Sequence, residues 1–578
     1  MPHPRMGKPH SSSRMIAPVL PIPTHSDILV IGGGPAGSYA ATALAREGYD
    51  VTLLEKDHFP RYHIGESMLP SCRPFMRFID VEKTVEDFGF CVKVGGAIKF
   101  NHNKREGCEF PRRLADPSPS DANIPRAADT DFIPAGAAWN VERAEFDEIL
   151  IRNGAKNGVK VFEGVTVDPG SMEFACADAK PEELKPVALS WKSDRGTAGR
   201  TSFRYLVDAS GRNGIMSVRA SFLDSHGRSS GVQTRYLKNR KFNKALRSVA
   251  FWGYWTGQGV YAPGTRRENA IWLESLTDES GWAWFIPLRG KVSVGIIIKE
   301  DRSKEKKAAF TGPNANAEYY HAQLRLLPGC QKLLANARFL GEVMTAGDYS
   351  YSAPLHAGPN YRIIGDAGAF IDPFFSSGVH LAFNGGLTAA ATIGAAIRGD
   401  CTEEEAAKFH TTKVGTSYTR FMMVVLAAYR QILHQSVPVM SDIDEDNYDR
   451  AFDFIRPVIQ GAADTDGKVT EDMLQATMDF CEHAMGITDP EMHADVAQRV
   501  DPALLEHEGP LMSVQALKEI AGDDEEAEVV LRRVQARKAL EALHWQPNFR
   551  GESFDGLSIR MERGKLGLNN LKAAEAGL

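Results

Sequence analysis

The spacing of apolar and polar residues changes along the chain, and the changes separate segments of different kinds. From Asp27 to about residue 230, short apolar runs alternate with stretches of helical spacing, apart from a loop-rich interruption near 101–136. Such alternation predicts strands that are followed by helices, as in an α/β core.

Between about residues 245 and 300, β-branched and aromatic runs separated by turn residues predict an antiparallel sheet beside this core. The runs are Val249–Trp255, Ala270–Leu273, Trp282–Pro287 and Val292–Ile298. From residue 361 the chain returns to a strand, a Gly-Asp turn and a helix of small residues, as if it rejoined the first core. Beyond about residue 401 the spacing is helical.

Composition and charge exclude several classes of protein. The chain is 43% hydrophobic and 24% charged, which is typical of a globular protein. Its 578 residues are too many for a single hydrophobic core. The net charge is -7 and the basic residues are dispersed, so we expect no binding of nucleic-acid phosphates. The longest apolar run, Phe421–Ala428, is too short to cross a membrane and predicts a buried helix segment instead.

Cysteine usage and the first residues favour a cytoplasmic protein. The 7 cysteines are scattered without Cys-x-x-Cys spacing, which argues against a zinc site or a disulfide framework. Residues 1–25 are rich in proline and serine and lack the apolar core of a signal peptide. We therefore expect a flexible tail at 1–25, no metal site and no association with a membrane.

The first apolar strand leads directly into a glycine-rich turn. The strand is predicted at Ile28–Ile31, and the turn, Gly32–Gly37, reads Gly-Gly-Gly-Pro-Ala-Gly. A helix follows to about Glu47, where Gly48 suits the left-handed cap. The positive N-terminal end of this helix would face the phosphates of a bound nucleotide.

Three glycines of this turn have different structural roles. Gly32 allows the tight turn, Gly34 lets the backbone approach a pyrophosphate, and Gly37 lets the helix pack on the strand. We expect the cofactor contacts of this turn to come from Gly32, Gly33, Gly34, Ala36 and Gly37.

A carboxylate completes this dinucleotide unit. The second strand, Val51–Leu54, ends in Glu55, where the side chain can accept hydrogen bonds from ribose hydroxyls. The acid favours a free ribose over a 2'-phosphate. Strand, glycines, helix, strand and acid in register predict a dinucleotide site, and the N-terminal position favours FAD over NAD.

Four further segments, in this order, resemble the flavin monooxygenase superfamily over nearly the first 400 residues. They are Phe59–His63, Trp139–Asp147, Asp208–Gly211 and Tyr361–Ala367. The resemblance implies that Arg61 and Arg143 contact FAD and that Asp366 binds its ribityl chain.

Within this superfamily the chain resembles the flavin-dependent halogenases, most closely the fungal branch that chlorinates phenols. His63–Pro70 looks like the family's Gly-Glu-Ser segment, which implies that Glu66 borders the flavin. Phe88–Gly96 resembles the segment that carries the family's catalytic lysine, which implies this role for Lys93. Without the resemblance Lys93 would be read as an ordinary surface lysine, and Lys99 is the competing candidate.

A pair of tryptophans matches the family's Trp-x-Trp-x-Ile-Pro motif. Trp282 and Trp284 lie two residues apart on a predicted strand, so their side chains point to the same side. Packing in a hydrophobic core is the ordinary explanation of such a pair. The resemblance instead implies a wall that separates the organic substrate from the flavin.

The segment Asp372–Val379 precedes a helix and resembles the family's halide-binding turn. The backbone amides of Ser377 and Gly378 could hold an anion at the positive end of the helix, and the family places chloride there. Val379 would lie beside the flavin. A serine that only caps the helix is the plain alternative, and sulfate or phosphate would suit the same geometry.

One departure from the family bears on the substrate. Tryptophan-chlorinating members have a glutamate just before their Ser-Thr-Gly turn, and this chain has Phe375 there. An acid that would polarise an indole is therefore missing. A phenol needs less help because its own oxygen donates electron density into the ring, so the departure favours a phenolic substrate.

The resemblance and the spacing together predict an α/β protein with a Rossmann-type FAD-binding domain, an inserted antiparallel β-sheet substrate domain and a helical C-terminal region. We expect the FAD-binding core at 26–240 and 355–400, the sheet domain at 241–354, and a helical region at 401–578 that covers the substrate pocket.

The implied activity is that of a halogenase which uses FADH2 and oxygen. A separate flavin reductase would supply FADH2, chloride would be oxidised to hypochlorous acid, and Lys93 would pass the chlorine to a phenol of polyketide type. The substrate could arrive free or tethered to a carrier protein. An aromatic hydroxylase is the first alternative; a flavin reductase of isoprenoid double bonds and a non-catalytic FAD-binding protein are the others.

Overall fold

The computed structural model describes most of the chain. The described residues are 21–102, 107–109, 138–176, 183–217, 236–237, 240–265, 267–436, 458–459, 464, 490–505, 514–538 and 552–571. Most of the tail expected at 1–25, and most of the loop-rich stretch expected at 101–136, lie outside these ranges.

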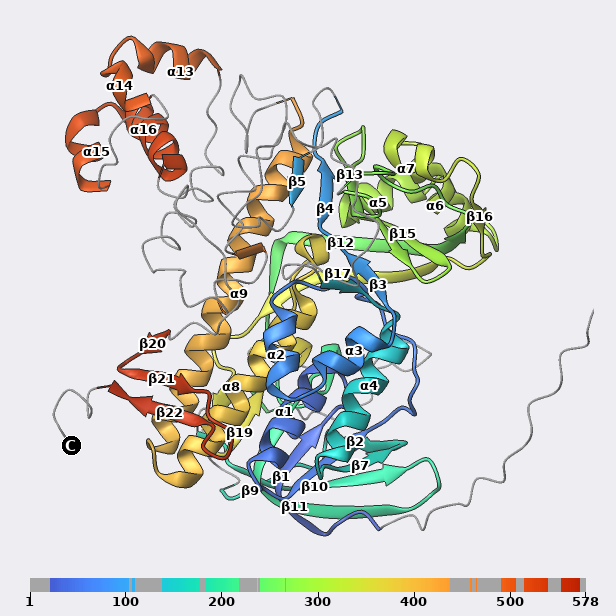
Figure 1. Cartoon of the computed structure of the whole chain (residues 1–578), viewed down its shortest axis with the longest axis vertical. Coiled ribbons are helices and arrows are strands. Elements are labelled where there is room, and N and C mark those ends of the chain that lie inside the picture. The colour runs from blue at the N-terminus through green and yellow to red at the C-terminus, as the bar shows by residue number, and fades with distance from the viewer. Residues whose placement is uncertain are drawn as a thin grey trace, which may run out of the picture.

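A nine-stranded sheet forms the lower half of the molecule in Figure 1. Its main path runs β18-β19-β11-β1-β2-β7, and β10 joins β8 and β9 to β11. The strands are β1 (His25–Ile31), β2 (Val51–Glu55), β7 (Lys160–Glu163), β8 (Val165–Val167), β9 (Glu173–Phe174), β10 (Pro186–Ser193), β11 (Ala198–Asp208), β18 (Ala357–Gly358) and β19 (Tyr361–Ile363). β1 is parallel to both β2 and β11, which is the arrangement of a Rossmann-type core.

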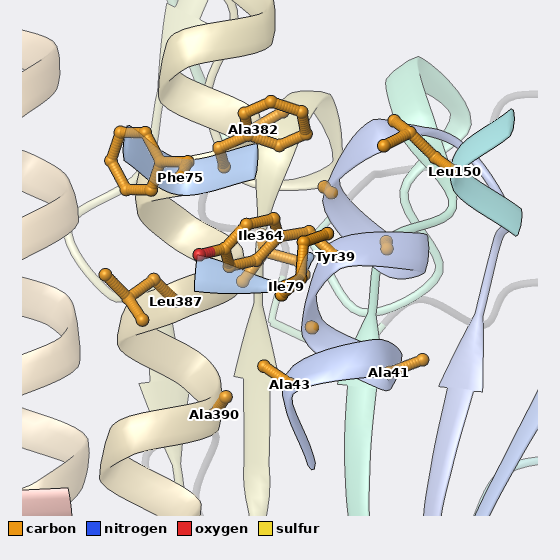
Figure 2. Close-up of a cluster of buried hydrophobic side chains, with 14 of the residues drawn as sticks. Tyr39, Ala41, Ala43, Phe75, Ile79, Leu150, Ile364, Ala382, Leu387 and Ala390 are labelled. Carbon is orange, nitrogen blue, oxygen red and sulfur yellow. The ribbon is translucent and has the colours of Figure 1, made fainter. Parts of the chain in front are cut away.

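Helices cover the parallel part of this sheet and bury its apolar side chains. They are α1 (Pro35–Arg46), α2 (Cys72–Phe78), α3 (Glu82–Asp87), α4 (Arg143–Lys156) and α8 (Gly378–Arg398). Figure 2 shows Tyr39 and Ala43 from α1 in one cluster with Phe75 from α2 and Leu387 from α8. Each large apolar side chain buried in this way stabilises the fold by roughly 1.5–3 kcal/mol. Residues of α8 therefore complete the core that the N-terminal unit begins.

The expected alternation of strands and helices stops earlier than the spacing suggested. After α4, the elements among the described residues as far as β11 are strands, and β10 and β11 form an antiparallel hairpin. Gly196, with φ of +82°, makes the turn between them. A hairpin connection of this kind needs no crossover helix.

An eight-stranded sheet forms the second layer and confirms the predicted antiparallel runs. Its order is β16-β12-β15-β14-β13-β4-β5, with β17 beside β12. The strands are β4 (Gly96–Lys99), β5 (Gly107–Glu109), β12 (Lys241–Thr256), β13 (Ile271–Ser275), β14 (Gly281–Leu288), β15 (Lys291–Lys299), β16 (Arg338–Phe339) and β17 (Met344–Ser352). β12 to β15 pair antiparallel, whereas β4 pairs parallel with β13.

The second sheet thus takes two strands from the range 26–240 that we assigned to the FAD-binding core. β4 lies between β13 and β5: its apolar residues Ala97 and Ile98 are buried, and the strand lies opposite Ile271–Glu274 of β13. The predicted domain boundary at residue 241 therefore does not separate the two sheets, because β4 and β5 precede it in the chain but pack in the second sheet. Between α3 and β4, the short strand β3 (Cys91–Lys93) pairs with β6 (Ala138–Asn140).

The two faces of the second sheet are covered by different helices. The helices α5 (Glu300–Lys307), α6 (Ala315–Leu324) and α7 (Pro328–Leu333) lie on one side. Ala283 and Phe285 pack with this group, while Trp282 and Trp284 pack on the other side against α9 (Glu403–Leu433). The two tryptophans therefore share one face of β14, as their spacing predicted.

The long helix α9 spans both sheets in Figure 1. Thr402 and Glu405 form a reciprocal capping box at its start, and its apolar stretch from Phe421 to Ala428 is largely buried, as expected. No helix among the described residues is long and apolar enough to cross a membrane. Further on, α13 (Pro490–Ala497), α14 (Pro502–Leu505), α15 (Val514–Ala521) and α16 (Glu525–Lys538) pack with one another.

The expectation of a purely helical region at 401–578 is wrong for its final segment. A three-stranded sheet forms there from β20 (Ser553–Phe554), β21 (Leu557–Arg560) and β22 (Gly567–Asn570). The adjacent Leu566 is fully buried in the same cluster as Tyr39. The Glu47 carboxylate accepts hydrogen bonds from the amides of Gly564 and Leu566 at 2.9 Å each. This segment therefore packs on the FAD-binding core.

Candidate active site

The glycine turn between β1 and α1 has the geometry that its sequence predicts. Gly32 has φ of +102°, and a Cβ there would lie 2.2 Å from the Ala209 carbonyl oxygen. A Cβ at Gly37 would lie 1.9 Å from the Gly32 carbonyl oxygen, so the start of α1 packs directly on the turn. The nearest atom to a Cβ at Gly34 is an Arg61 nitrogen at 3.5 Å. Open space and a positive charge thus lie where a pyrophosphate would bind.

The acid at the end of β2 closes the other side of this turn. One oxygen of Glu55 accepts the Gly33 amide at 2.6 Å and the other accepts the Asp57 amide at 2.9 Å. Each carboxylate oxygen keeps a second lone pair, so both can still accept ribose hydroxyls.

Two arginines lie beside the turn and share one buried carboxylate. The Asp147 carboxylate accepts Arg61 at 3.0 Å and two Arg143 nitrogens at 2.7 and 2.9 Å. Burial opposes the charge on Arg143, but Asp147 outweighs it and holds the pKa of Arg143 above its usual value. The guanidinium also donates to the Ile64 carbonyl at 2.8 Å. Both predicted arginines are therefore fixed in orientation by the same carboxylate.

The Gly-Asp segment lies against the start of α1. It forms the short helix η4 (Gly365–Ala367), in which Gly365 has φ of +57°. A Cβ at Gly365 would lie 2.9 Å from the Ala36 Cβ, so the two predicted cofactor segments touch. Asp366 is half-buried, and its charge acts on Arg143. Glycine turn, ribose acid, arginines and Asp366 thus surround one region, and the set fits FAD in charge and in space.

Glu66 lies in a separate hydrogen-bonded group. Its carboxylate is buried and accepts the Tyr254 hydroxyl at 2.6 Å, while burial raises the pKa of Glu66. Tyr62 lies 3.1 Å from the Tyr254 hydroxyl and accepts the Trp252 indole N–H at 2.8 Å. Strand β12 thereby holds the Gly-Glu-Ser segment against the second sheet.

Lys93 is buried, unlike an ordinary surface lysine. It ends β3, its side chain is 5% exposed, and Nζ donates to the Met68 carbonyl at 3.0 Å. Leu69, which follows Met68 in the chain, packs in the hydrophobic cluster that contains Trp282 and Phe375. Lys99, by contrast, is half-buried on β4 in the second sheet.

The tryptophan pair forms a hydrogen-bonded wall. The rings of Trp282 and Trp284 lie 6.0 Å apart, and the Trp282 ring lies edge-on to Phe374 at 4.9 Å. The Trp282 indole donates to the Tyr429 hydroxyl at 3.1 Å, and that hydroxyl donates to Asp372 at 2.5 Å. A buried indole needs such a partner, and α9 supplies it.

Glycine on the neighbouring strand makes room for the second ring of this wall. A Cβ at Gly295 of β15 would lie 2.1 Å from the Trp284 ring, and the Trp284 indole donates to Ser293 on the same strand at 3.1 Å. Both indoles are therefore held in place on two sides.

The turn before α8 has the shape of an anion site. After η5 (Pro373–Phe375), Ser376 adopts a left-handed conformation with φ of +56°, and Ser377 occupies the N-cap of α8. The Ser377 side chain makes no capping hydrogen bond, so the plain capping explanation is wrong. Its buried Oγ has no hydrogen-bond partner within the described part of the chain. A Cβ at Gly378 would meet nothing within 4 Å.

One pocket joins the predicted ribityl and halide segments. Gly365, Asp366 and Gly378 line it, together with Val414 and Tyr418 of α9. Val379 is buried in the cluster of α1 and α8, on the FAD-binding side. Phe375 is buried beside Phe374, at a ring distance of 4.9 Å.

Three polar residues of the site were not predicted from the sequence. Asp147 follows Arg143 by four residues on α4, and this helical spacing was the signal that could have found it. Tyr254 and Tyr429 reach the site from β12 and α9, and no local pattern marks either one.

Two buried histidines beneath the Gly-Asp segment predict sensitivity to acid. Burial lowers the pKa of His356 to about 4, and it lowers the pKa of His410 well below its usual value. The unfolded chain then binds more protons than the folded chain below about pH 6.5. Stability should be complete above pH 6.5 and fall towards pH 4, by up to about 1.4 kcal/mol per pH unit for each histidine.

Urea unfolding of wild type and His356→Gln at several pH values between 7.5 and 5 measures this effect. The variant should lose stability less steeply than wild type, because one of the two histidines no longer titrates. Equal slopes for the two proteins would contradict the assignment to His356.

The fold and the site define an FAD-dependent oxidoreductase. The profile of the tryptophan halogenase family matches residues 27–118 and 119–436, which is more than half of the chain. The chain belongs to this family of flavin-dependent halogenases. It is accordingly an enzyme that uses FAD in its reduced form, with chloride as co-substrate.

Fungal proteins are similar to the chain over almost its full length. Flavin-dependent halogenase armH1 of Armillaria mellea is 51% identical over 559 residues, which are 95% of this chain and 99% of the relative. Flavin-dependent halogenase ascD of Acremonium egyptiacum is 41% identical, and the match covers 96% of this chain and 94% of the relative.

Solved halogenase structures share the fold. The myxobacterial chondrochloren halogenase CndH superposes with a TM-score of 0.57 at 25% identity, covering 80% of this chain and 98% of that one. The halogenase PltM, solved with phloroglucinol and FAD, superposes with a TM-score of 0.54 at 15% identity. The match covers 89% of this chain and 96% of PltM. The predicted fold class is thereby confirmed.

Proposed function

We propose that the enzyme chlorinates an electron-rich phenol, of polyketide type, with hypochlorous acid that Lys93 passes on. The buried Lys93 amine carries this proposal, because it lies next to the cluster that holds the tryptophan wall and Phe375. Bound FADH2 supplies the oxygen activation that oxidises chloride to hypochlorous acid. The residues of the chain place the reactants and exclude water.

Chloride binds first, at the turn before α8. The Ser377 hydroxyl has no hydrogen-bond partner among the residues that the structure describes. Together with the amide of Gly378 and the positive end of the 21-residue helix α8, it favours an anion there. The open space at Gly378 leaves room for the ion.

The tryptophan wall would then keep the phenol away from the bound flavin. Trp282 and Trp284 fill the space between the second sheet and α9, and their hydrogen bonds to Tyr429 and Ser293 fix both rings. Only a small molecule such as hypochlorous acid would pass this wall. Exclusion of the phenol suppresses hydroxylation, which the same cofactor supports in related enzymes.

Lys93 captures the hypochlorous acid. In one route the neutral amine forms an N–Cl bond, and the displaced hydroxide leaves as water with an amine proton. In the other route the ammonium group holds the acid by hydrogen bonding. In both routes an ortho or para carbon of the phenol takes the chlorine and the ring loses a proton.

Phenols suit this site because Phe375 stands where an indole-activating acid would be needed. PltM was solved with phloroglucinol, a phenol, and the fungal relatives are halogenases. We further propose that a separate reductase supplies FADH2, that the enzyme acts in the cytoplasm, and that the phenol arrives free or on a carrier protein.

Mass spectrometry of products tests the proposed reaction. The enzyme is incubated with FADH2, oxygen and a panel of phenols, with chloride, with bromide and without halide. Chlorinated products with the isotope pattern of one chlorine are expected only with chloride. An oxygenated phenol formed equally well without halide would instead identify an aromatic hydroxylase.

Removal of the Ser377 hydroxyl should weaken halide binding. Ser377→Ala takes away one hydrogen-bond donor to the anion, so the chloride concentration for half-maximal chlorination should rise about tenfold, since a hydrogen bond to a charged group is worth about 1.5–3 kcal/mol. Ser376→Ala is the control, because Ser376 precedes the cap and we assign it no halide contact. An unchanged chloride dependence in Ser377→Ala would refute the proposed contact.

A further inference from the structure

Three buried side chains connect the halide turn with the segment that holds Lys93. His380 lies in the first turn of α8, with Nδ1 2.9 Å from the Ser71 hydroxyl and Nε2 2.9 Å from an Asp464 oxygen. His380 is fully buried, Ser71 is 3% exposed and Asp464 is 5% exposed. Both ring nitrogens are therefore engaged inside the protein.

The charge on Asp464 fixes the direction of these hydrogen bonds. Asp464 also accepts Lys413 at 2.8 Å and Ser417 at 2.5 Å. Burial alone would raise the pKa of Asp464, but Lys413, His380 and Arg420 outweigh it and hold the pKa well below its usual value. Nε2 of His380 must then donate to this carboxylate, and Nδ1 faces the Ser71 hydroxyl.

A second carboxylate completes the group. Glu552 accepts Lys413 at 2.6 Å and Arg420 at 2.8 Å, so two acids and two bases balance each other around Asp464. Charged groups that are paired in this way hold one geometry, because any displacement leaves a charge buried without a partner.

Ser71 connects this charged group to Lys93 through the short stretch of chain back to Met68. The amide of Cys72 donates to the Leu69 carbonyl at 3.0 Å, so Leu69 to Cys72 form a turn that contains Ser71. Met68 directly precedes this turn, and its carbonyl accepts Lys93 Nζ at 3.0 Å. On the other side, the Leu381 amide donates to the Ser377 carbonyl at 2.9 Å, which places His380 in rigid register with the halide turn.

We propose that Ser71, His380 and Asp464 form a positioning unit that sets the Lys93 amine relative to the halide turn. None of the three touches substrate in this inference, which rests on the proposed function and deepens it. Ser71 is too deeply buried to act as a nucleophile toward a substrate of its own. Capture of a small, diffusing oxidant depends on where the amine stands, so loss of the unit should let hypochlorous acid escape while its formation continues.

The experiment measures how much of the oxidant is captured. FADH2 is supplied to the full-length enzyme with oxygen, chloride and a phenol that wild type chlorinates, and chlorinated phenol is counted per FADH2 oxidised. A soluble amine added in a parallel sample traps escaped hypochlorous acid as chloramine. The variants are Ser71→Ala, which removes the hydroxyl, and His380→Gln, whose amide can still donate to Asp464 but does not reach Ser71.

Both variants should lower the chlorinated phenol per FADH2 about tenfold and raise the trapped chloramine, with FADH2 oxidation within about twofold of wild type. Ser71→Thr, which keeps a hydroxyl, should restore the ratio. Thr201→Val serves as the matched control, because it removes a buried hydrogen bond of 3.0 Å from Trp191, far along the chain from this unit. It should lower Tm without changing the ratio.

Lys93→Ala in the same assay distinguishes failure of the positioning unit from failure of the proposed function. If it loses chlorinated phenol while Ser71→Ala and His380→Gln keep the wild-type ratio, the positioning unit is refuted and the proposed function stands. If Lys93→Ala still chlorinates fully, the proposed function fails and the inference fails with it. Should Ser71→Ala not fold, His380→Gln and Asp464→Asn give the same comparison, and a wild-type ratio in both would overturn the inference.

Discussion

Replacement of Lys93 by alanine is expected to abolish chlorinated product while enzyme-bound FADH2 is still oxidised. The amine lies in a buried position and donates to the Met68 carbonyl, so its loss removes the group that captures hypochlorous acid and leaves the FAD-binding residues unchanged. The loss of product should exceed about a hundredfold, which is the scale for a misplaced or missing reactive group. Product by mass spectrometry and FADH2 oxidation by absorbance are measured together.

Lys99→Ala is the matched control for this prediction. Lys99 is the nearest competing lysine in the sequence, but it belongs to β4 of the second sheet. The control should keep its product. Product that disappears in Lys99→Ala and persists in Lys93→Ala would reverse the assignment of the catalytic lysine.

Replacement of Gly32 by alanine should eliminate FAD binding. A Cβ at this position would lie 2.2 Å from the Ala209 carbonyl oxygen, and φ of +102° is strained for alanine whatever the space. The turn must move, and its amides then no longer face a pyrophosphate. Absorbance of flavin that stays with the protein after gel filtration in FAD measures the loss, and a thermal scan gives the change in Tm.

Gly196→Ala is the matched control for Gly32→Ala. It introduces alanine at a positive φ but without a steric clash, so it measures the cost of the backbone conformation alone. Gly196 has φ of +82° at the hairpin between β10 and β11, and a Cβ there would meet nothing within 4 Å. This control should lose only about 1–2 kcal/mol of stability and keep its FAD. Retention of FAD by Gly32→Ala at the level of Gly196→Ala would show that the close approach to Ala209 is unimportant.

Local patterns predicted the parts of the structure that depend on local geometry. The β1 strand, the turn at Gly32 and the helix that ends before Gly48 follow from strand spacing, glycine conformation and capping, all within about 25 residues. The common face of Trp282 and Trp284 follows from the two-residue period of a strand.

Partners that meet only in the fold could not be predicted in this way. Tyr429 is 147 residues from Trp282, and Asp464 is 84 residues from His380, so no window of sequence contains both members of either pair. The same limit explains why the range 26–240, which was predicted for the FAD-binding core, contains a strand of the second sheet, since the parallel pairing of β4 with β13 depends on packing and not on local spacing.

The resemblance to halogenases supplied roles that residue chemistry alone would not give. Burial of Lys93 contradicts the usual expectation that a lone lysine lies at the surface, and its apolar neighbours Cys91, Val92 and Val94 are the local signal for that burial. Ser377 is the opposite case, because helix-start statistics favour a capping serine and the structure shows a side chain that caps nothing.

The contact between Glu47 and Gly564 spans 517 residues of chain and has a consequence for biosynthesis. At typical elongation rates of about 5–20 residues per second, roughly 25 to 100 s separate the synthesis of α1 from that of the segment which packs on it. During this interval the apolar surface that Leu566 later covers is exposed on the nascent chain. Chaperone demand should therefore persist until translation has passed residue 571.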